Sequence, residues 1–273
     1  MFNLRRIALA QMNSSTNPLQ NFEQAEKFTH AAKEQQAKII FFPENFNFMG
    51  RLGDSLKQAQ SLEGEYMTKY KSLAKACNIW MSLGGFQELG PSAEKHYNTH
   101  VIIDNFGEIK ATYRKIHLFD VKLSEKTQIF ESRFVQPGSS ITPPLDSPIG
   151  KLGLSVCYDL RFPELYRKLS LQGAEILLIP AAFMEKTGYA HWEVLLRARA
   201  IENGCFVIAS AQDGTHEGGR VSYGHTCVID PWGMIIAQAS EETRLLITDI
   251  DLGMIAKSRE KIPTLQHVRL ISQ

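Results

Sequence analysis

The sequence predicts an α/β protein in which the strands form a mixed sheet, or two sheets covered by helices. Short apolar runs of strand length alternate with helical patterns through much of the 273 residues. Some runs are joined by helices and others by tight turns, so both crossover and hairpin connections are expected. No linker, repeat or low-complexity tract divides the chain, and we therefore expect a single domain over residues 1–273.

In the first half of the chain, IALAQ and AKIIFFPE are apolar runs of strand length, with a helical pattern between them. IWMSLGGF is a third such run, and HYNTHVIIDNFGEIKATYRKIHLF indicates two strands around an Asn-Phe-Gly turn. The expected order is strand 7–11, helix 21–35, strand 37–44, helix 65–77, strand 79–86, a hairpin within 96–119 turning at 105–107, and a polar loop over 120–138.

In the second half, KLGLSVC, AEILLIPA and CFVIASAQ are apolar runs separated by helical patterns. PELYRKLSLQG and AHWEVLLRARAIENG each close on glycine, which is favoured just past a helix end. GHTCVIDPWGMIIAQA is typical of a hairpin. The expected order is strand 151–157, helix 163–173, strand 174–181, helix 190–204, strand 205–212, a hairpin within 224–239 turning at 230–233, strand 244–252 and a short helix from 254.

Composition argues against several classes of partner. Lysine and arginine number 30 and aspartate and glutamate 29, so the basic excess usual for nucleic-acid or membrane-surface binding is absent. No apolar stretch approaches the length of about 18 residues that spans a bilayer. The N-terminus lacks a secretory signal, and too little sequence precedes the first strand for a transit peptide. The four cysteines form no CxxC pair, which favours a reduced, cytoplasmic protein.

Three reactive side chains share one placement. Glu44 ends IIFFPE, Lys115 ends ATYRK, and Cys157 ends LGLSVC. Each lies at the carboxyl end of a predicted apolar strand, where ligands and catalytic groups gather in α/β sheets. Sheet strands bring distant segments side by side, so we expect the three side chains to meet.

Cys157 is the best candidate nucleophile. The segment after it begins a helix with Pro163 near the first turn, and positive potential at a helix N-terminus favours a thiolate. The alternative is an inert buried strand cysteine, which suits Cys205 and Cys227, while Cys77 suits a helix face. For Cys157 the catalytic interpretation is favoured.

Glu44 is the candidate general base, because partial desolvation after IIFF and a proline would raise its pKa toward a range useful for proton transfer. A strand-end glutamate that reaches solvent is an equal alternative. Lys115 could hold the negative oxygen of a tetrahedral intermediate. Alone, however, TYRKIH is more typical of an exposed strand with alternating charge.

Other catalytic templates fail. The sequence has no GxSxG elbow, no glycine-rich phosphate loop and no HExxH. His96 and His100 are four residues apart but lie in a predicted strand, so we expect no metal site there. A papain-like pair of Cys157 with His117 or His225 stays open, although neither the local signature nor the chain order supports it.

Three motif blocks, FPENF, YRKIHLFD and CYDLRFPEL in that order, resemble those of the nitrilase superfamily of carbon–nitrogen hydrolases. The resemblance covers nearly the whole chain, and the ordered combination is highly specific. It implies a four-layer α-β-β-α sandwich with mixed sheets, commonly dimerised, so we expect a homo-oligomer. It also implies a catalytic triad of Glu44, Lys115 and Cys157, with no metal and no cofactor.

The same resemblance implies a second glutamate between the lysine and cysteine blocks. In KTQIFESRFVQPG this is Glu131, which would orient or support the lysine. Glu125 competes for the role, but its spacing before the Pro-Gly turn is wrong.

The C-terminal half resembles the deaminated-glutathione amidase branch, through AHWEVLLRARAIENGCFVIASAQ and SYGHTCVIDPWG. The resemblance implies hydrolysis of deaminated glutathione to 2-oxoglutarate and cysteinylglycine, through a thioester. Such a 2-oxoacid needs a cation, and Arg161 can bind a carboxylate bidentately unless it pairs with Glu164. Phe183 and Thr187 could line the pocket, and the N–H of Tyr158 could assist Lys115 at the oxyanion.

Two other functions are weighed against this one. One is an ω-amidase that acts on 2-oxoglutaramate, or another small-amide hydrolase. The other is a catalytically inactive relative that serves as an interaction module, against which the three intact catalytic side chains argue.

Overall fold

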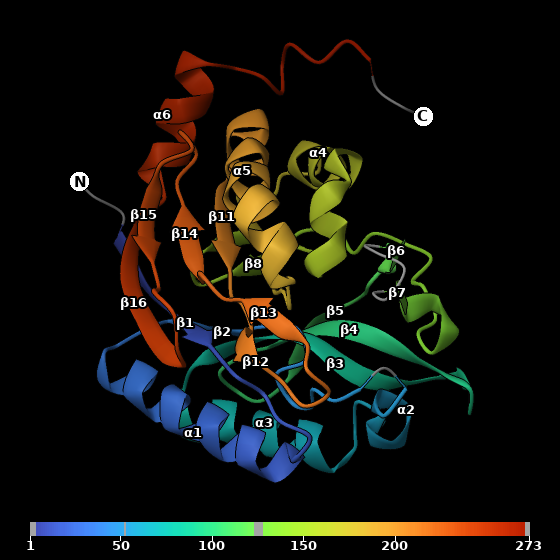
Figure 1. Ribbon diagram of the computed structural model, residues 1–273. Helices are drawn as coiled ribbons and strands as arrows, with labels where there is room; N and C mark the ends of the chain where they lie inside the picture. Colours follow the sequence, from blue (N-terminus) through green and yellow to red (C-terminus); the bar gives the residue numbers. More distant parts are fainter. Residues whose placement is uncertain (1–3, 52, 123–127, 271–273) are drawn as a thin grey trace.

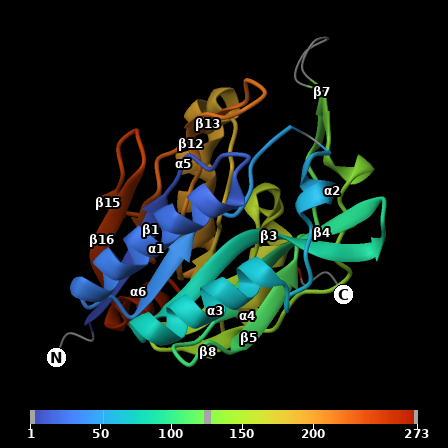
Figure 2. The same cartoon turned by 90° about the horizontal axis from the view of Figure 1, so that it is seen from below.

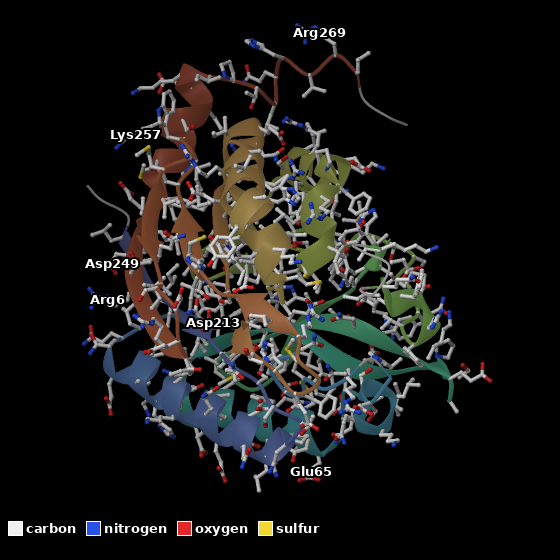
Figure 3. The ribbon with its side chains drawn as sticks, in the orientation of Figure 1. Arg6, Glu65, Asp213, Asp249, Lys257 and Arg269 are labelled. Carbon is white, nitrogen blue, oxygen red and sulfur yellow. The ribbon has the colours of Figure 1, made fainter. Side chains whose placement is uncertain are left out.

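The computed structural model describes residues 4–51, 53–122 and 128–270, and two six-stranded sheets organise them. The first sheet has the order β16-β1-β2-β3-β4-β5. Only the pairings of β2 with β1 and β3 are parallel. Its strands are β1 (Leu4–Gln11), β2 (Ile39–Phe42), β3 (Trp80–Ser92), β4 (Lys95–Ile103), β5 (Ile109–Arg114) and β16 (Arg244–Asp251). Arg6 and Asp249 pair across β1 and β16 with an N–O distance of 3.0 Å (Figure 3).

The second sheet has the order β15-β14-β11-β10-β9-β8. Its central strands β9, β10 and β11 run parallel, and the outer pairings are antiparallel. Both sheets are therefore mixed, as predicted. The strands are β8 (Leu145–Ser147), β9 (Gly150–Leu154), β10 (Ile176–Leu178), β11 (Phe206–Ala209), β14 (Cys227–Ile229) and β15 (Ile235–Gln238).

Helices cover the outer face of each sheet. Helices α1 (Pro18–Glu34) and α3 (Glu65–Cys77) lie together against the first sheet (Figure 2), and α4 (Pro163–Leu171) and α5 (Glu185–Asn203) lie on the opposite side of the molecule (Figure 1). The remaining elements are α2 (Ser55–Gln58), α6 (Gly253–Lys261), the 3-10 helices η1 (Glu131–Arg133) and η2 (Cys157–Arg161), and the hairpins of β6 (Asp120–Lys122) with β7 (Gln128–Phe130) and β12 (Asp213–Thr215) with β13 (Val221–Tyr223).

The alternation of side chains along β1 shows why four layers form. Ile7 and Leu9 pack into the core shared with the second sheet. Ala8 and Ala10 face the other way, into the core beneath α1 and α3. Because successive strand residues point to opposite faces, a strand that is apolar at every position must be covered on both sides. The α-β-β-α sandwich is therefore confirmed.

The structure differs from the expected elements in several places. The predicted polar loop over 120–138 contains the β6–β7 hairpin and η1, and the β12–β13 hairpin was not predicted. Helix α5 begins at Glu185, five residues before the predicted start, and its first turn is closed by the Gly188 N–H, which donates to the Met184 carbonyl at 2.7 Å. Strand β9 ends at Leu154, three residues before Cys157.

Candidate active site

Strand ends from both sheets converge on one site. Glu44 follows β2 and Lys115 follows β5 in the first sheet, whereas Cys157 follows β9 in the second. Cys157 opens η2 with φ of 47°, in the left-handed region that non-glycine residues rarely adopt. Its backbone N–H donates to the carbonyl of Pro180 at 2.9 Å. The packing of the two sheets thus brings together the three side chains that the sequence singled out.

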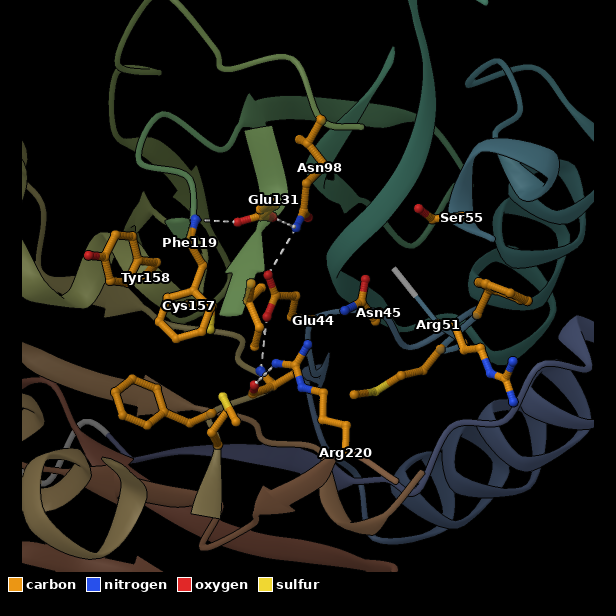
Figure 4. Close-up of a pocket in the computed structure, with 18 of the residues that line it drawn as sticks. Glu44, Asn45, Arg51, Ser55, Asn98, Phe119, Glu131, Cys157, Tyr158 and Arg220 are labelled. Atoms are coloured by element: carbon orange, nitrogen blue, oxygen red, sulfur yellow. Dashed lines mark hydrogen bonds between the residues drawn. The ribbon is translucent and has the colours of Figure 1, made fainter. Parts of the chain in front are cut away.

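Lys115 lies between the carboxylates of Glu44 and Glu131, both of which are labelled in Figure 4. Its Nζ is 2.9 Å from Glu44 Oε1, 3.0 Å from Glu131 Oε1 and 2.9 Å from Glu131 Oε2. The lysine side chain is only 2% exposed. A buried cation needs such partners, because desolvation without them would neutralise it. The structure places Glu131 beside the lysine, at hydrogen-bond distance through both carboxylate oxygens.

Glu44 is held by two further donors. The backbone N–H of Ala182 donates to Oε2 at 3.0 Å, and Asn98 Nδ2 donates to Oε1 at 2.9 Å. Charge-assisted hydrogen bonds of this kind fix the orientation of a carboxylate. The carboxylate therefore has little freedom to leave the site.

Glu131 joins the lysine to the segment that follows it. Its Oε2 accepts a hydrogen bond from the N–H of Phe119 at 2.6 Å, and η1 presents the side chain inward. The competing residue, Glu125, lies outside the described residues.

The opposite charges keep Glu44 and Lys115 ionised. Burial alone would raise the pKa of Glu44, but Lys115, assisted by Arg220, outweighs burial, and the pKa of Glu44 is lowered. Burial alone would lower the pKa of Lys115, but Glu131 and Glu44 raise it above its ordinary value. The prediction that desolvation raises the Glu44 pKa is therefore wrong, because it left out the adjacent cations.

The Cys157 thiol holds its proton. Burial raises the pKa of Cys157, and Glu44 raises it further through its charge and a hydrogen bond with the thiol. Lys115 and the N–H of Ala182 act in the opposite direction without reversing the shift. The prediction of a thiolate is wrong. The segment after the cysteine is a five-residue 3-10 helix, and α4 begins only at Pro163.

The two histidines considered as bases have other partners. His117 Nδ1 lies 2.7 Å from Asp159 Oδ1. His225 Nδ1 lies 2.7 Å from the carbonyl of Tyr223, on whose ring it stacks. Neither ring lines the pocket that holds Cys157. The carboxylate of Glu44 therefore occupies the place that an imidazole holds in a papain-like pair.

The three catalytic candidates open onto a pocket of about 390 Å³. Four residues predicted to contact substrate also line it, namely Tyr158, Arg161, Phe183 and Thr187. The guanidinium of Arg161 lies 5.1 Å from the Phe183 ring centroid and 5.9 Å from that of Tyr158. This end of the pocket therefore combines a cation with aromatic walls.

Arg161 forms no ion pair with a carboxylate of the described residues. Its Nη1 lies 3.2 Å from His191 Nδ1, and no ion pair with Glu164 forms within the described chain. The alternative of an intramolecular ion pair at Arg161 is thus not seen among the residues that the structure describes, and Arg161 lines the pocket.

A comparison with protein families shows to which family the protein belongs. A model of the carbon–nitrogen hydrolases matches residues 6–260. The chain belongs to the carbon–nitrogen hydrolase family. The buried Cys157 of this carbon–nitrogen hydrolase lies in the same pocket as Glu44, Lys115 and Glu131.

Individual relatives cover nearly the whole chain of this carbon–nitrogen hydrolase. It is 46% identical over 265 residues to the nitrilase and fragile histidine triad fusion protein NitFhit of Caenorhabditis elegans, with 96% of this chain and 60% of the relative covered. It is 44% identical over 267 residues to the deaminated glutathione amidase of Mus musculus, with 96% and 83% covered. The chain thus spans about three fifths of the worm fusion protein.

Solved structures agree with the fold. The C. elegans NitFhit structure superposes with a TM-score of 0.93 at 45% identity, covering 97% of this chain and 65% of that one. An amidase from Nesterenkonia sp. AN1, in which acrylamide has added at the active site cysteine, superposes with a TM-score of 0.79 at 27% identity, covering 95% and 98%.

Sequence reasoning missed several groups of this hydrolase site. Asn98 and the N–H of Ala182 hold Glu44, and Arg220 reaches the pocket from the β12–β13 hairpin. A polar residue inside the apolar run NTHVII was a usable signal for Asn98, because a buried amide needs a partner. Arg220 gave only the weak signal of an arginine after a Gly-Gly turn.

The described residues carry neither a metal-binding cluster nor a membrane-spanning helix. They contain no group of three or more His, Cys, Asp or Glu side chains placed to hold a metal ion. Among them, no helix is long and apolar enough to cross a membrane.

Proposed function

We propose that this protein is an amidase that hydrolyses deaminated glutathione to 2-oxoglutarate and cysteinylglycine, through a thioester on Cys157. The observation that carries the proposal is the thiol of Cys157 beside Glu44 and Lys115, in a pocket that Arg161 also lines without a carboxylate partner among the described residues. Relatives named deaminated glutathione amidase, at 44% identity in mouse, supply the substrate.

In the acylation step, Glu44 takes the thiol proton as sulfur attacks the amide carbonyl carbon. The carbonyl oxygen gains the negative charge and lies against Lys115 and the backbone N–H of Tyr158. That N–H donates to no acceptor in the described part of the chain. When the tetrahedral intermediate collapses, the C–N bond breaks and protonated Glu44 returns its proton to the departing amine.

In the deacylation step, Glu44 is again an ionised carboxylate and removes a proton from water as the water attacks the thioester carbonyl. The C–S bond then breaks, and the proton on Glu44 returns to sulfur. Glu131 holds Lys115 in place through both steps at 2.9 Å, because the ammonium would otherwise be drawn toward Glu44 alone.

The acyl part of the substrate carries a 2-oxoacid carboxylate. Arg161 supplies its cation, with Phe183 and Thr187 as the adjacent wall. No metal or organic cofactor enters this scheme. We also propose a cytoplasmic location, since all four cysteines are free thiols.

Mass spectrometry of products from a substrate panel tests the proposal. The panel contains deaminated glutathione, 2-oxoglutaramate, glutamine, N-carbamoyl amino acids and simple nitriles. We expect deaminated glutathione to be cleaved fastest. Cys157→Ala should abolish turnover and the trapped thioester. Cys227→Ala, which removes a buried strand thiol outside the pocket, should retain both turnover and the thioester.

The other outcomes separate the alternatives. Efficient cleavage of 2-oxoglutaramate alone would make the protein an ω-amidase. An unreactive Cys157, with no cleavage of any amide, would indicate an interaction module. Normal turnover by Cys157→Ala would contradict the mechanism.

A further inference from the structure

Arg220 enters the pocket beside the catalytic carboxylate (Figure 4). Its Nη2 donates to the carbonyl of Ala182, whose N–H donates to Glu44 Oε2 at 3.0 Å. The backbone of Ala182 thus links the Arg220 guanidinium to the carboxylate of Glu44. Arg220 takes part in neither the acylation step nor the deacylation step.

The Arg220 guanidinium has no direct carboxylate partner among the described residues, although its charge helps to lower the pKa of Glu44. Its Nε–H is buried and has no hydrogen-bond partner among the described residues, and the guanidinium forms no ion pair with them. Lys115, by contrast, lies between two carboxylates. A buried guanidinium N–H without an acceptor costs free energy of folding. An anionic ligand that accepts from two guanidinium nitrogens at once would remove that cost.

The β12–β13 hairpin is built to hold Arg220 in this place. Its tip turns through Gly218 and Gly219, with φ of 88° and 81°, which favour glycine. The N–H of His216 donates to the carbonyl of Arg220 at 2.8 Å. The buried His216 ring contacts the Ser14 carbonyl at 3.1 Å and Ser222 Oγ at 2.9 Å. The base of the side chain is therefore fixed to the sheet.

The reaction decides which part of the substrate meets Arg220. Glu44 returns its proton to the departing nitrogen, so that nitrogen and the fragment attached to it must face Glu44. Arg161 lies at the other end, with Tyr158 and Phe183. In Figure 4, Tyr158 and Arg220 lie on opposite sides of Glu44. Arg161, beside Tyr158 and Phe183, and Arg220, beside Ala182, therefore line different parts of the pocket.

We propose that Arg220 binds the carboxylate of the departing amine fragment, so that the enzyme prefers substrates that are anionic at both ends. The inference rests on the proposed function, in which the departing cysteinylglycine ends in a carboxylate. Glu217 is the nearest acidic side chain in sequence, and it is exposed with its Oε2 accepting from Thr16 Oγ1 at 2.5 Å.

Three substrates test the proposal. They are deaminated glutathione, its analogue with a C-terminal carboxamide, and 2-oxoglutaramate, whose departing group is ammonia. We expect wild-type kcat/KM to favour the acid over the carboxamide by about 10- to 100-fold, the range of a charge-assisted bidentate contact. Arg220→Gln should bring this ratio close to one. Arg220→Lys, which keeps the charge but loses the fork, should give an intermediate ratio.

The ratio separates substrate binding from an effect on Glu44. A loss of support for Glu44 would lower kcat/KM for all three substrates alike, and that result would overturn the proposal. Arg51→Gln is the matched control, because Arg51 lines the pocket rim but is exposed. Loss of the acid preference in Arg51→Gln instead would also overturn it. If Arg220→Gln unfolds, the Arg220→Lys ratio decides alone.

Failure of the proposed function looks different. If the wild-type enzyme cleaved neither deaminated glutathione nor its carboxamide, both the function and this inference would be wrong. If it cleaved both equally well, only the inference would be wrong.

Discussion

Cys157 rests as a thiol beside an ionised carboxylate, which determines how it becomes a nucleophile. The pKa of Cys157 is raised by burial and by Glu44, while that of Glu44 is lowered by Lys115 against the effect of burial. The proton therefore stays on sulfur in the free enzyme. Thiolate forms as the carbonyl is attacked, which avoids a permanently reactive thiolate that oxidants and other electrophiles would attack.

Glu44→Gln should change reactivity and turnover in opposite directions. The glutamate charge raises the thiol pKa, so its removal leaves Lys115 to favour thiolate and lowers that pKa. We expect the rate of Cys157 alkylation by iodoacetamide to rise at lower pH than in the wild type. Turnover should fall by about 100- to 10,000-fold, because the general base is lost. Peptide mass spectrometry across a pH series and steady-state kinetics measure the two effects.

Glu88→Gln is the control for this substitution. Glu88 is a buried glutamate that pairs with Arg114 at 2.6 Å and does not line the pocket. It should leave the alkylation profile of Cys157 unchanged. An alkylation profile in Glu44→Gln that moves to higher pH would contradict the assigned charge states.

At this scale, strand-end position was enough to predict which side chains meet, but not their charge. Glu44, Lys115 and Cys157 each follow an apolar run, and that placement can be read from the sequence. Their pKa values depend on one another and on the N–H of Ala182, which comes from a strand end distant in the chain. Strand patterns do not contain those distances.

At the scale of elements, Asp159 ties the nucleophile segment to the lysine segment. Its Oδ2 accepts from Tyr113 Oη at 2.8 Å and from the N–H of Val156 at 2.8 Å. Its Oδ1 accepts from the N–H of His117 at 3.1 Å. These three residues lie within two positions of Lys115 or Cys157. One buried carboxylate thus sets the relative position of β5 and η2.

Asp159→Asn should loosen that connection. An amide replaces one acceptor oxygen with a donor, so at least one facing backbone N–H loses its acceptor. We expect unfolding free energy to fall by about 2 to 4 kcal/mol, and kcat by about tenfold or more as the thiol and ammonium lose their alignment. Denaturant unfolding and steady-state kinetics on the same preparation measure both quantities.

Asp230→Asn provides the matched comparison. Asp230 is also buried, but it accepts from the N–H groups of Trp232 and Met234 through Oδ1 alone, at 2.8 Å and 3.0 Å. An asparagine can keep both bonds, so this change should cost less stability and leave kcat intact. Equal losses of kcat in the two variants would show that Asp159 has no positioning role.

Most long elements were predictable because their patterns are strong. Helix α3 matches its predicted range, and the turn at 230–233 joins β14 and β15 as expected. The β12–β13 hairpin was not predictable in this way, since its strands have three residues each and no apolar alternation. Its placement depends on His216 and on contacts with β1 and the segment after β10, which are tertiary.

At the scale of the whole molecule, one outer surface is unusually apolar. Val194 and Ile201, seven residues apart on one face of α5, are exposed by 67% and 49%. Trp232 and Met234, in the turn between β14 and β15, are exposed by 49% and 55%, and this turn packs against Ile201 through Gly233. Large contiguous apolar surfaces on folded chains usually mark interaction sites.

We propose that this α5 surface pairs with its counterpart on a second copy of the chain. Val194→Asp should therefore convert a dimer, or a larger even assembly, to smaller units, because a carboxylate buried in the interface is costly. Phe106→Asp is the matched control, since Phe106 is 68% exposed but lies in the β4–β5 turn beside α3. Light scattering after size-exclusion chromatography measures the mass of each variant. A wild-type chain that elutes as a monomer, or a Val194→Asp variant with unchanged mass, would rule out this surface as the interface.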